Sequence, residues 1–346
     1  MELEMLKRGY IKATSYYFEI DLPFYNEHLK DFLPDQIIDI HSHVATPEML
    51  KPDAKPPTFW AERVCPNGMS VESLIESYEL MFPGKKVTPV IFGLPSDRFI
   101  LEKENEYVSK CAEKFGLNAL ILTRPSWSSE ELERLVEEGG FIGLKPYPSM
   151  AKGKKPDEIE IFDYLPKHHL ELANEKRWLI ILHIPRSGRL DDETNIKQLL
   201  EIDEKYPHAK VVVAHVGRSY CPKQGEKGLD RLKDSQNLFF DISANTNEAI
   251  FERLIETIGT KRILFGSDMP ISGMHAKRIC KDSNYINVIL GADWVDEHTR
   301  PASPEDRVTF FLYEEIYAFR KAAEKMGLGR KDIEDIFLLN ARRILE

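Results

Sequence analysis

Short apolar runs alternate with longer mixed segments along most of the chain. Runs such as LIILHI and KVVVAHV are apolar at nearly every position. This pattern is typical of strands that are covered on both faces, as in a parallel sheet or a barrel. We therefore predict eight buried strands, at 37–43, 87–93, 118–122, 141–147, 179–184, 210–216, 237–243 and 262–267.

The segments between these runs carry apolar residues at helical spacing. Ser128 and Glu131 form a capping-box pattern, and Asn245 or Thr246 is placed to cap the helix after the seventh strand. Gly116 supplies a helix stop. The clearest predicted helices cover 71–82, 97–116, 129–138, 194–206 and 247–258.

Eight strand–helix alternations favour one closed (β/α)8 TIM barrel of the α/β class over an open doubly wound sheet. We assign residues 37–346 to this barrel, and residues 1–36 to an N-terminal extension packed on its outside or its N-terminal end. Long loops follow the first and the eighth strand, at 44–70 and 269–304. Loops after barrel strands lie at the catalytic face, so we expect these two to form lids or substrate walls.

Composition narrows the partners of this chain of 346 residues. A net charge of −10 without a Lys/Arg-rich block argues against nucleic acid, and no apolar run is long enough to span a membrane. The N-terminus lacks the apolar core of a signal peptide, and the four cysteines are scattered, which favours reduced thiols in the cytoplasm. We expect a small-molecule substrate and leave assembly into a homo-oligomer open.

The first predicted strand reads IIDIHSHV. Because strand side chains alternate, Asp39, His41 and His43 should project to one face, where the two imidazoles converge. Such a pair suits one divalent ion, although an H-x-H pair alone is a weak signal.

Three more polar residues end apolar strands: His183 follows LIIL, His215 follows VVVA and Asp268 follows ILFGS. The carboxyl ends of barrel strands meet at one pole, so these side chains should converge with the first histidine pair. Neutral imidazoles and a carboxylate match zinc best, and they also accept Mn²⁺, Fe²⁺ or Co²⁺. A bound ion with an open position brings the pKa of water to roughly 7.

At these residues the chain resembles the amidohydrolase superfamily, within it the amidohydrolase-related (amidohydrolase 2) family of metal-dependent hydrolases and decarboxylases. The resemblance spans about 37 to 345. It rests on the motifs DIHSH at 39–43, GLKPYP at 143–148, LHIPR at 182–186, AHVGR at 214–218, FDIS at 240–243, LFGSDMP at 264–270 and NARRIL at 340–345.

The resemblance implies a role for each of these residues. A metal would be held by His41, His43, His183 and Asp268. Asp268 would also shuttle the catalytic proton, and His215 would polarise or orient the substrate.

Lys145 occupies the position where binuclear members of the superfamily carry a carboxylated lysine that bridges two metals. A second metal held by carboxylated Lys145, a contact to a substrate anion and a structural ion pair all remain open.

Tyr147, Arg186 and Arg218 follow strand ends and are candidates for substrate binding. An arginine fork suits a carboxylate, although an ordinary ion pair between loops explains either arginine equally well. Nucleoside deaminases of the superfamily carry a glutamate where this chain has Arg186, which argues against deamination of a nucleoside.

The leading functional hypothesis is hydrolysis of a C–N or C–O bond in a small, carboxylate-bearing substrate by metal-activated water. The alternative is metal-dependent, non-oxidative decarboxylation of an aromatic or unsaturated acid, in which protonated Asp268 delivers a proton to carbon. A third hypothesis is a barrel that keeps the ligands but serves only as a binding protein, and it predicts a blocked mouth.

Overall fold

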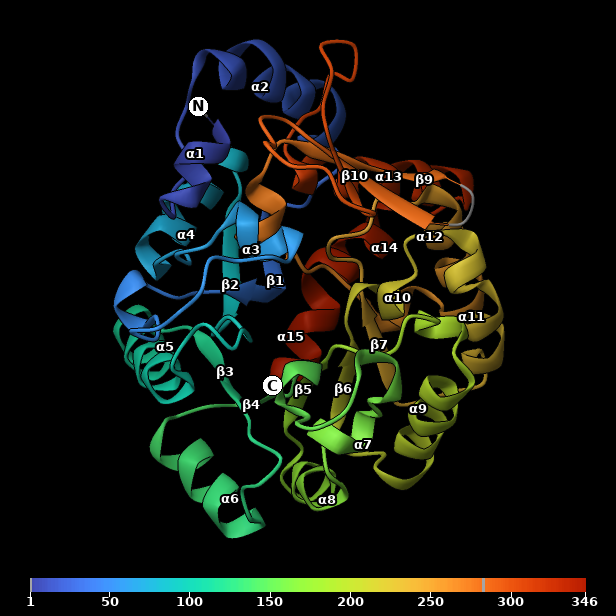
Figure 1. The fold of residues 1–346 in the computed structure, drawn as a ribbon. Coiled ribbons are helices and arrows are strands. Elements are labelled where there is room, and N and C mark those ends of the chain that lie inside the picture. Colours follow the sequence, from blue (N-terminus) through green and yellow to red (C-terminus); the bar gives the residue numbers. More distant parts are fainter. Residues whose placement is uncertain (1, 282–283) are drawn as a thin grey trace.

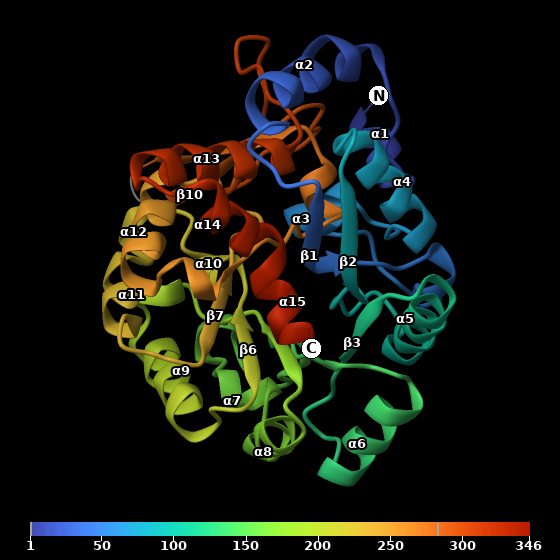
Figure 2. The same cartoon turned by 180° about the vertical axis from the view of Figure 1, so that it is seen from behind.

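The computed structural model describes residues 2–281 and 284–346, in which eight parallel strands form one sheet with the order β1 to β8. Helices surround this sheet on its outside (Figures 1 and 2). The strands are β1 (Gln36–His43), β2 (Lys86–Phe92), β3 (Asn118–Leu122), β4 (Gly143–Lys145), β5 (Leu179–Leu182), β6 (Lys210–Val213), β7 (Leu238–Asp241) and β8 (Ile263–Leu264). The predicted TIM barrel is therefore confirmed.

The barrel closes between β1 and the chain that follows the very short β8. The amide of Ile40 donates to the carbonyl of Phe265 at 3.1 Å, and the amide of Asp268 donates to the carbonyl of His41 at 2.8 Å. An isolated parallel bridge joins Ser42 to Met269. The segment that carries Asp268 is thus bonded directly to the strand that carries the histidine pair.

The outer helices lie close to the predicted positions. Ser128 accepts the amide of Glu131 at 3.2 Å and caps α6 as predicted. The prediction for α12 is wrong by one or two residues, because Asn247 is the cap while Asn245 donates to the carbonyl of Ser219. The helices packed on the strands are α4 (Val71–Met81), α5 (Leu101–Phe115), α6 (Ser129–Glu138), α8 (Lys167–Lys176), α9 (Glu193–Lys205), α11 (Glu226–Leu232), α12 (Glu248–Ile258) and α13 (Phe311–Lys325).

Apolar side chains fill the middle of the barrel. The C-terminal helix α15 (Asn340–Leu345) packs Ala341 and Ile344 against this inner cluster. A barrel filled in this way is a packed core rather than a pore, so ligand space is left only beyond the strand ends. The inner cluster contains Ile40, Val90, Phe92, Leu120, Leu179, Ile181, Val212, Ala214 and Leu264.

Residues before β1 form α1 (Glu2–Lys7) and a continuous helical stretch of η1 (Tyr17–Asp21), α2 (Leu22–Phe24) and η2 (Tyr25–Leu29). The Tyr17 and Tyr25 hydroxyls donate to the carbonyls of Leu80 and Pro83, at the end of α4. The carbonyl of Leu6 accepts from the thiol of Cys65, in the loop after β1. This segment therefore packs on the outside of the barrel and also on the loop that follows β1.

The segment expected to be a long loop after the eighth strand contains a small sheet, which corrects that part of the prediction. Its strands are β9 (Ala276–Lys281), β10 (Asn284–Ile289) and β11 (Thr299–Pro301), in the order β11-β10-β9. This sheet lies beside α13 (Figure 1). Its strands pair with one another outside the barrel, so the β–α alternation gives no signal for them.

A disulfide joins Cys221, after β6, to Cys280 of β9, with a Cα–Cα distance of 5.7 Å. The expectation of four reduced thiols is wrong for this pair, because cysteines 59 residues apart in sequence meet only through the fold. Cys65 and Cys111 are buried free thiols. The predicted cytoplasmic location thereby loses part of its support.

In the part of the chain that the structure describes, no helix is long and apolar enough to cross a bilayer.

Candidate active site

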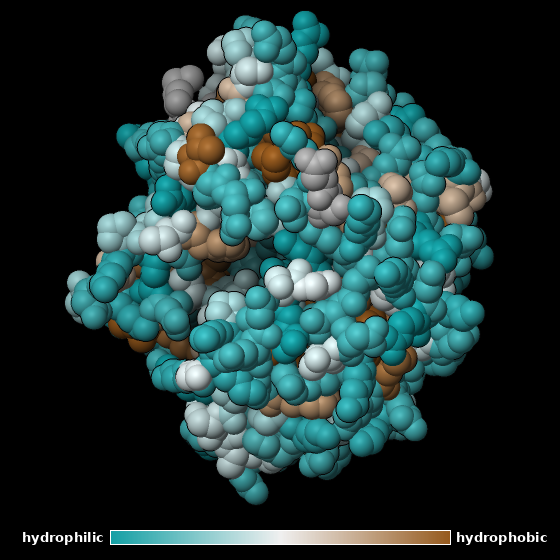
Figure 3. All heavy atoms as spheres, turned by 45° about the vertical axis from the view of Figure 1, so that its right-hand side comes forward, coloured by the Kyte–Doolittle hydropathy of each residue, from teal (hydrophilic) through white to brown (hydrophobic). Residues whose placement is uncertain are grey.

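A cavity of about 460 Å³ lies at the carboxyl ends of the strands. Seven polar side chains singled out in the sequence line it: His41, His43, Lys145, Tyr147, His183, His215 and Asp268. The two long loops contribute its walls, with Trp60 from the first and Ile271 and Arg278 from the second. Phe59, which is 52% exposed, lines the cavity near the protein surface. That surface is mainly hydrophilic on the face shown in Figure 3, with small separate hydrophobic patches.

The hydrogen bonds of His41 fix its tautomer. Its Nδ1 lies 2.9 Å from Oδ2 of Asp241, and a carboxylate can only accept, so Nδ1 carries the proton. Nε2 then carries a lone pair, which accepts from Nζ of Lys145 at 2.9 Å. Burial, together with the nearby Lys145 charge, holds the pKa of His41 well below its usual value. The ring is therefore neutral and can serve as a ligand.

His43 and His215 are oriented in the same way. His43 Nδ1 donates to the carbonyl of Gly93 at 2.8 Å, and His215 Nδ1 lies 3.2 Å from the carbonyl oxygen of Ser243. Three imidazoles thus keep an Nε2 lone pair, while their Nδ1 protons are donated to fixed acceptors. Metal-binding histidines are held in the same manner, so this donor set fits a divalent cation.

Asp268 completes the group nearest the first strand. Its Oδ1 lies 3.3 Å from Nε2 of His43 and 3.6 Å from Nε2 of His41. Burial alone would raise the pKa of Asp268, and positive charge among His215, His43 and His41, carried by a proton or by a bound cation, lowers it. Asp268 is therefore an ionised carboxylate at neutral pH. Ligand atoms of His41, His43 and Asp268 lie within 4.8 Å of one another, as do those of His41, His215 and Asp241.

His183 lines the same cavity but belongs to neither of these two groups. Its ring centroid is 5.3 Å from that of His215 and 4.7 Å from that of Tyr147. The buried Nδ1 of His183 has no hydrogen-bond partner. Burial, reinforced by the Arg218 charge, keeps the pKa of His183 well below its usual value, so this ring is also neutral.

Lys145 is almost completely buried beside His41. Its Nζ lies 4.3 Å from the centroid of the Phe92 ring. Burial lowers the pKa of Lys145 to about 7, although the carboxylates of Asp268 and Asp241 oppose this shift. Neutral and charged forms of the amine therefore coexist near neutral pH, and the neutral form is the one that can react with carbon dioxide.

Two of the residues that carry the chemistry have left-handed backbone conformations. His215 has φ of 57° and Asp268 has φ of 58°. Such a conformation costs roughly 1–3 kcal/mol in a residue other than glycine. The amide of His215 donates to Oδ1 of Asp241 at 2.8 Å, and the Asp268 amide is held by His41. Site residues thus stabilise the turns that point other site residues into the cavity.

Asp39 does not share a face with the two histidines of its strand, so that prediction is wrong. The register of β1 against β2 shifts between Asp39 and Ser42, which marks a bulge. The Asp39 carboxylate accepts from the hydroxyl of Tyr78 and from the amide of Ser267 at 2.9 Å. Burial raises the pKa of Asp39 to about 6 against these hydrogen bonds. The bulge changes the alternation and turns Asp39 away from the cavity.

The structure places the three residues predicted to bind substrate in different surroundings. Tyr147 lines the cavity. Arg186 forms an ion pair with Asp192 at 3.0 Å, and Arg218 donates to the carbonyl of Ile184 at 3.3 Å. Neither arginine is part of the cavity lining.

Four further residues of this region had no role assigned from the sequence. Asp241 and Ser243 lie at the end of β7 and orient His41 and His215. Asp241 had the same signal as the chosen residues, because it is a polar residue that ends an apolar strand. Trp60 and Arg278 lie in the long loops, where the sequence pattern offered no comparable signal.

A family model described as "Amidohydrolase" matches residues 105–346. The chain belongs to this amidohydrolase family. This confirms the family resemblance predicted from the motifs. A sequence comparison with curated proteins found no match.

Solved structures of proteins named for three different reactions share this fold. A probable 2-pyrone-4,6-dicarboxylic acid hydrolase from Acinetobacter baumannii, with citric acid bound, is 15% identical with a TM-score of 0.56, over 89% of this chain and 98% of its own. A 4-oxalomesaconate hydratase from Rhodopseudomonas palustris is 18% identical with a TM-score of 0.55, over 89% and 95%.

A dihydroxybenzoic acid decarboxylase from Polaromonas sp. JS666, with manganese and 2-nitroresorcinol bound, is 16% identical with a TM-score of 0.52, over 90% and 97%. At such identities the likeness shows the fold. These neighbours of the amidohydrolase are enzymes that act on small molecules, by hydrolysis, hydration or decarboxylation.

Proposed function

We propose that this amidohydrolase hydrolyses a C–N or C–O bond in a small, carboxylate-bearing molecule with the help of a divalent metal. The observation that carries the proposal is the Asp268 carboxylate facing the unprotonated Nε2 atoms of His41 and His43. An exposed residue, Asp97, also lines the cavity, so the cavity extends to the surface. A barrel that only binds would need a blocked mouth instead.

In this proposal His41, His43, His183 and Asp268 hold the metal, and His215 lies beside them. The four donors match zinc, and they also accept Mn²⁺, Fe²⁺ or Co²⁺. When bound, the ion supplies Lewis acidity that polarises the substrate and lowers the pKa of water. A second ion, bridged by carboxylated Lys145, is the alternative arrangement.

In this proposal Asp268, His215 and Tyr147 each have a separate role in the reaction. Ionised Asp268 accepts the proton of the attacking water and returns it to the leaving group. Because the Nδ1 proton of His215 is donated to Ser243, its Nε2 is an acceptor, and we infer that it orients water or a donor group of the substrate. Burial raises the pKa of Tyr147, which keeps its phenol protonated as a donor to a substrate oxygen.

Decarboxylation of an aromatic acid is the second candidate, because aromatic side chains make up much of the cavity wall. These are Phe59, Trp60, Phe99, Tyr147 and Tyr220. That reaction needs a protonated acid that can deliver a proton to carbon. The Asp268 carboxylate, beside Nε2 of His43 and His41, is placed to accept a proton in its ionised form, so hydrolysis remains the first candidate.

A substrate screen separates these reactions. The metal-loaded protein should hydrolyse members of a panel of carboxylate-bearing lactones, esters and amides, followed by acid release at constant pH. Carbon dioxide release from aromatic acids, without turnover of any lactone, ester or amide, would replace hydrolysis by decarboxylation. Elemental analysis should find divalent metal in the wild type and none in the double variant His41→Ala/His43→Ala.

A further inference from the structure

Arg278 of β9 is a buried cation with one unused edge. It is 7% exposed, and its guanidinium carbon lies 3.9 Å from the ring centroid of Tyr220. Its Nη1 donates to the carbonyl of Ala244, and its Nε donates to Oδ1 of Asn287 at 2.8 Å. The buried Nη2 has no hydrogen-bond partner. The guanidinium is therefore held in place with one nitrogen unpaired, in a residue that lines the cavity.

A second unpaired donor lies nearby in α3 (Trp60–Val64), which follows β1. The indole Nε1 of Trp60 is buried and has no partner. The ring centroid of Trp60 lies 5.6 Å from the Arg278 guanidinium carbon, and both residues line the catalytic cavity. A buried donor without a partner costs about 1–3 kcal/mol, which an acceptor group of a ligand would recover.

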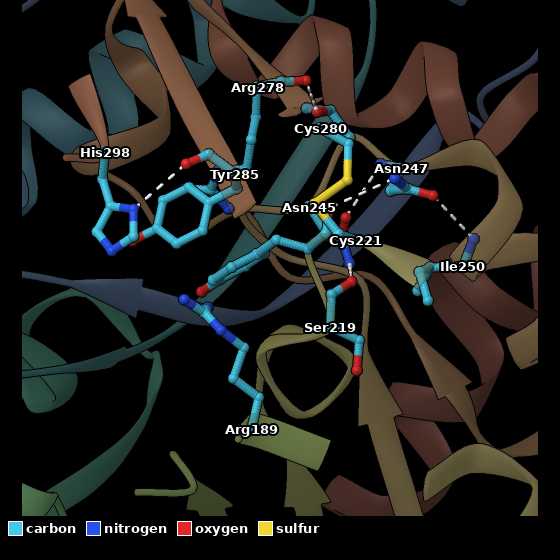
Figure 4. Close-up of a disulfide and its surroundings, with 12 residues drawn as sticks. Arg189, Ser219, Cys221, Asn245, Asn247, Ile250, Arg278, Cys280, Tyr285 and His298 are labelled. Atoms are coloured by element: carbon cyan, nitrogen blue, oxygen red, sulfur yellow. Dashed lines mark hydrogen bonds between the residues drawn. A yellow bond between two sulfur atoms is a disulfide. The ribbon is translucent and has the colours of Figure 1, made fainter. Parts of the chain in front are cut away.

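In the described part of the chain, the arginines around these donors are partnered by aromatic rings and neutral oxygens. The positive charges of Arg278, Arg218 and Arg189 all act to lower the pKa of Tyr220, against the effect of burial. The described residues place no carboxylate within ion-pair distance of any of these three arginines. Burial lowers the pKa of Arg189, and Arg218 lowers it further. In Figure 4 Arg278 and Arg189 approach Tyr285 from different elements, with the Cys221–Cys280 disulfide beside them. Buried cations are normally paired, so this cluster favours an anionic ligand.

This cluster is connected to the histidines through two consecutive residues. Ser243 accepts from Nδ1 of His215, and the next residue, Ala244, accepts from Nη1 of Arg278. Tyr147 and Phe99 add apolar surface to the wall of the same cavity. A flat molecule with a carboxylate at one end can therefore contact both Arg278 and the histidine group.

We propose that Arg278 and Trp60 form the carboxylate subsite of this enzyme, with Nη2 and Nε1 donating to the two oxygens of the substrate carboxylate. The reacting bond then lies toward the histidines. The inference rests on the proposed function for the identity of the reaction, but carboxylate binding can be measured without it. Guanidinium and carboxylate form strong charge-assisted hydrogen bonds.

The test measures equilibrium binding of benzoate and of its neutral analogue benzamide to the metal-containing protein by titration calorimetry. Benzoate should bind the wild type more tightly than benzamide. Arg278→Met should weaken benzoate binding roughly 10- to 100-fold and leave benzamide almost unchanged. Arg63→Met is the matched control, because Arg63 also stacks on an indole, at 5.5 Å from Trp294, but does not line the cavity. It should bind both ligands as the wild type does.

Trp60→Phe keeps an aromatic ring and deletes only the N–H, so it serves as a second variant if Arg278→Met does not fold. It should weaken benzoate binding by a smaller factor and leave benzamide binding unchanged. Equal benzoate affinity in the wild type and both folded variants overturns the subsite, as does a wild type that binds benzamide or inorganic phosphate more tightly than benzoate. Benzoate has no hydrolysable bond, so these outcomes are distinct from failure of the hydrolysis proposal.

Discussion

Oδ2 of Asp241 lies 2.9 Å from Nδ1 of His41, a residue 200 positions earlier in the chain. Oδ1 of the same carboxylate accepts from the backbone amide of His215 at 2.8 Å and from the hydroxyl of Ser243. Because that hydroxyl donates to Asp241, its oxygen is free to accept from Nδ1 of His215. One carboxylate thus sets the tautomer of one histidine and the orientation of another.

We expect Asp241→Asn to lower metal affinity about 10- to 100-fold, as for other partners of ligating histidines. The amide of Asn can donate to Nδ1 of His41, which would move the proton to Nε2 and remove the lone pair that faces the cavity. The measurement is competition with a chromophoric chelator.

Asp39→Asn is the control, because Asp39 is an equally buried carboxylate that accepts the backbone amide of His41 but contacts no histidine side chain. It should lower the melting temperature and leave metal affinity unchanged. Equal metal affinity in Asp241→Asn and wild type would show that Asp241 supports the fold rather than the ligand set.

Asp268→Asn should retain the fold and lose nearly all turnover. An amide cannot exchange a proton, and general acid–base groups contribute ~10²- to 10⁴-fold to rate. The measurement is kcat on the best substrate from the screen, together with circular dichroism to verify folding. General acid–base groups contribute far more than about tenfold to the rate. A folded variant that keeps more than about a tenth of wild-type kcat therefore contradicts the proton-transfer role.

Lys145 should make the stability of the metal-free protein depend on pH. Its pKa is about 7 in the folded protein against an ordinary value of 10.5, so between these values the unfolded chain binds more protons. The free energy of unfolding should therefore rise with pH in this window, by about 2 kcal/mol between pH 7 and 9. Urea unfolding of the wild type and of Lys145→Met, at both pH values, measures the difference.

The variant should lack this contribution, because methionine does not titrate. A rise of the same size in both proteins would assign the pH dependence to other groups. A fall of wild-type stability relative to the variant over this range would contradict the lowered pKa.

The disulfide gives a direct test of the fold around Arg278. Denatured, non-reduced protein should expose two titratable thiols, Cys65 and Cys111, and reductant should release two more. The double variant Cys221→Ser/Cys280→Ser should lose roughly 2–4 kcal/mol of unfolding free energy, because a cross-link across a long segment restricts the unfolded chain. Four thiols without reductant in freshly purified protein would contradict the bond.

The local pattern of the sequence determined the barrel. Apolar runs such as KVVVAHV must be covered on both faces, and this requirement places strands and helices without knowledge of distant contacts. The same pattern indicated the polar residues that end strands, among them His183, His215 and Asp268. Barrel geometry then places the carboxyl ends of all strands at one pole, so residues far apart in sequence could be assigned to one site.

Only the tertiary structure decided how these residues are used. The bulge in β1 turns Asp39 outward, and the fold pairs Arg186 with Asp192 while it leaves Nη2 of Arg278 without a hydrogen-bond partner. The disulfide between Cys221 and Cys280 and the bond from Asp241 to His41 also join segments far apart in sequence. Strand periodicity depends on neighbours within a few residues, whereas the partner of a charge or thiol depends on how non-adjacent segments pack, which the local pattern does not encode.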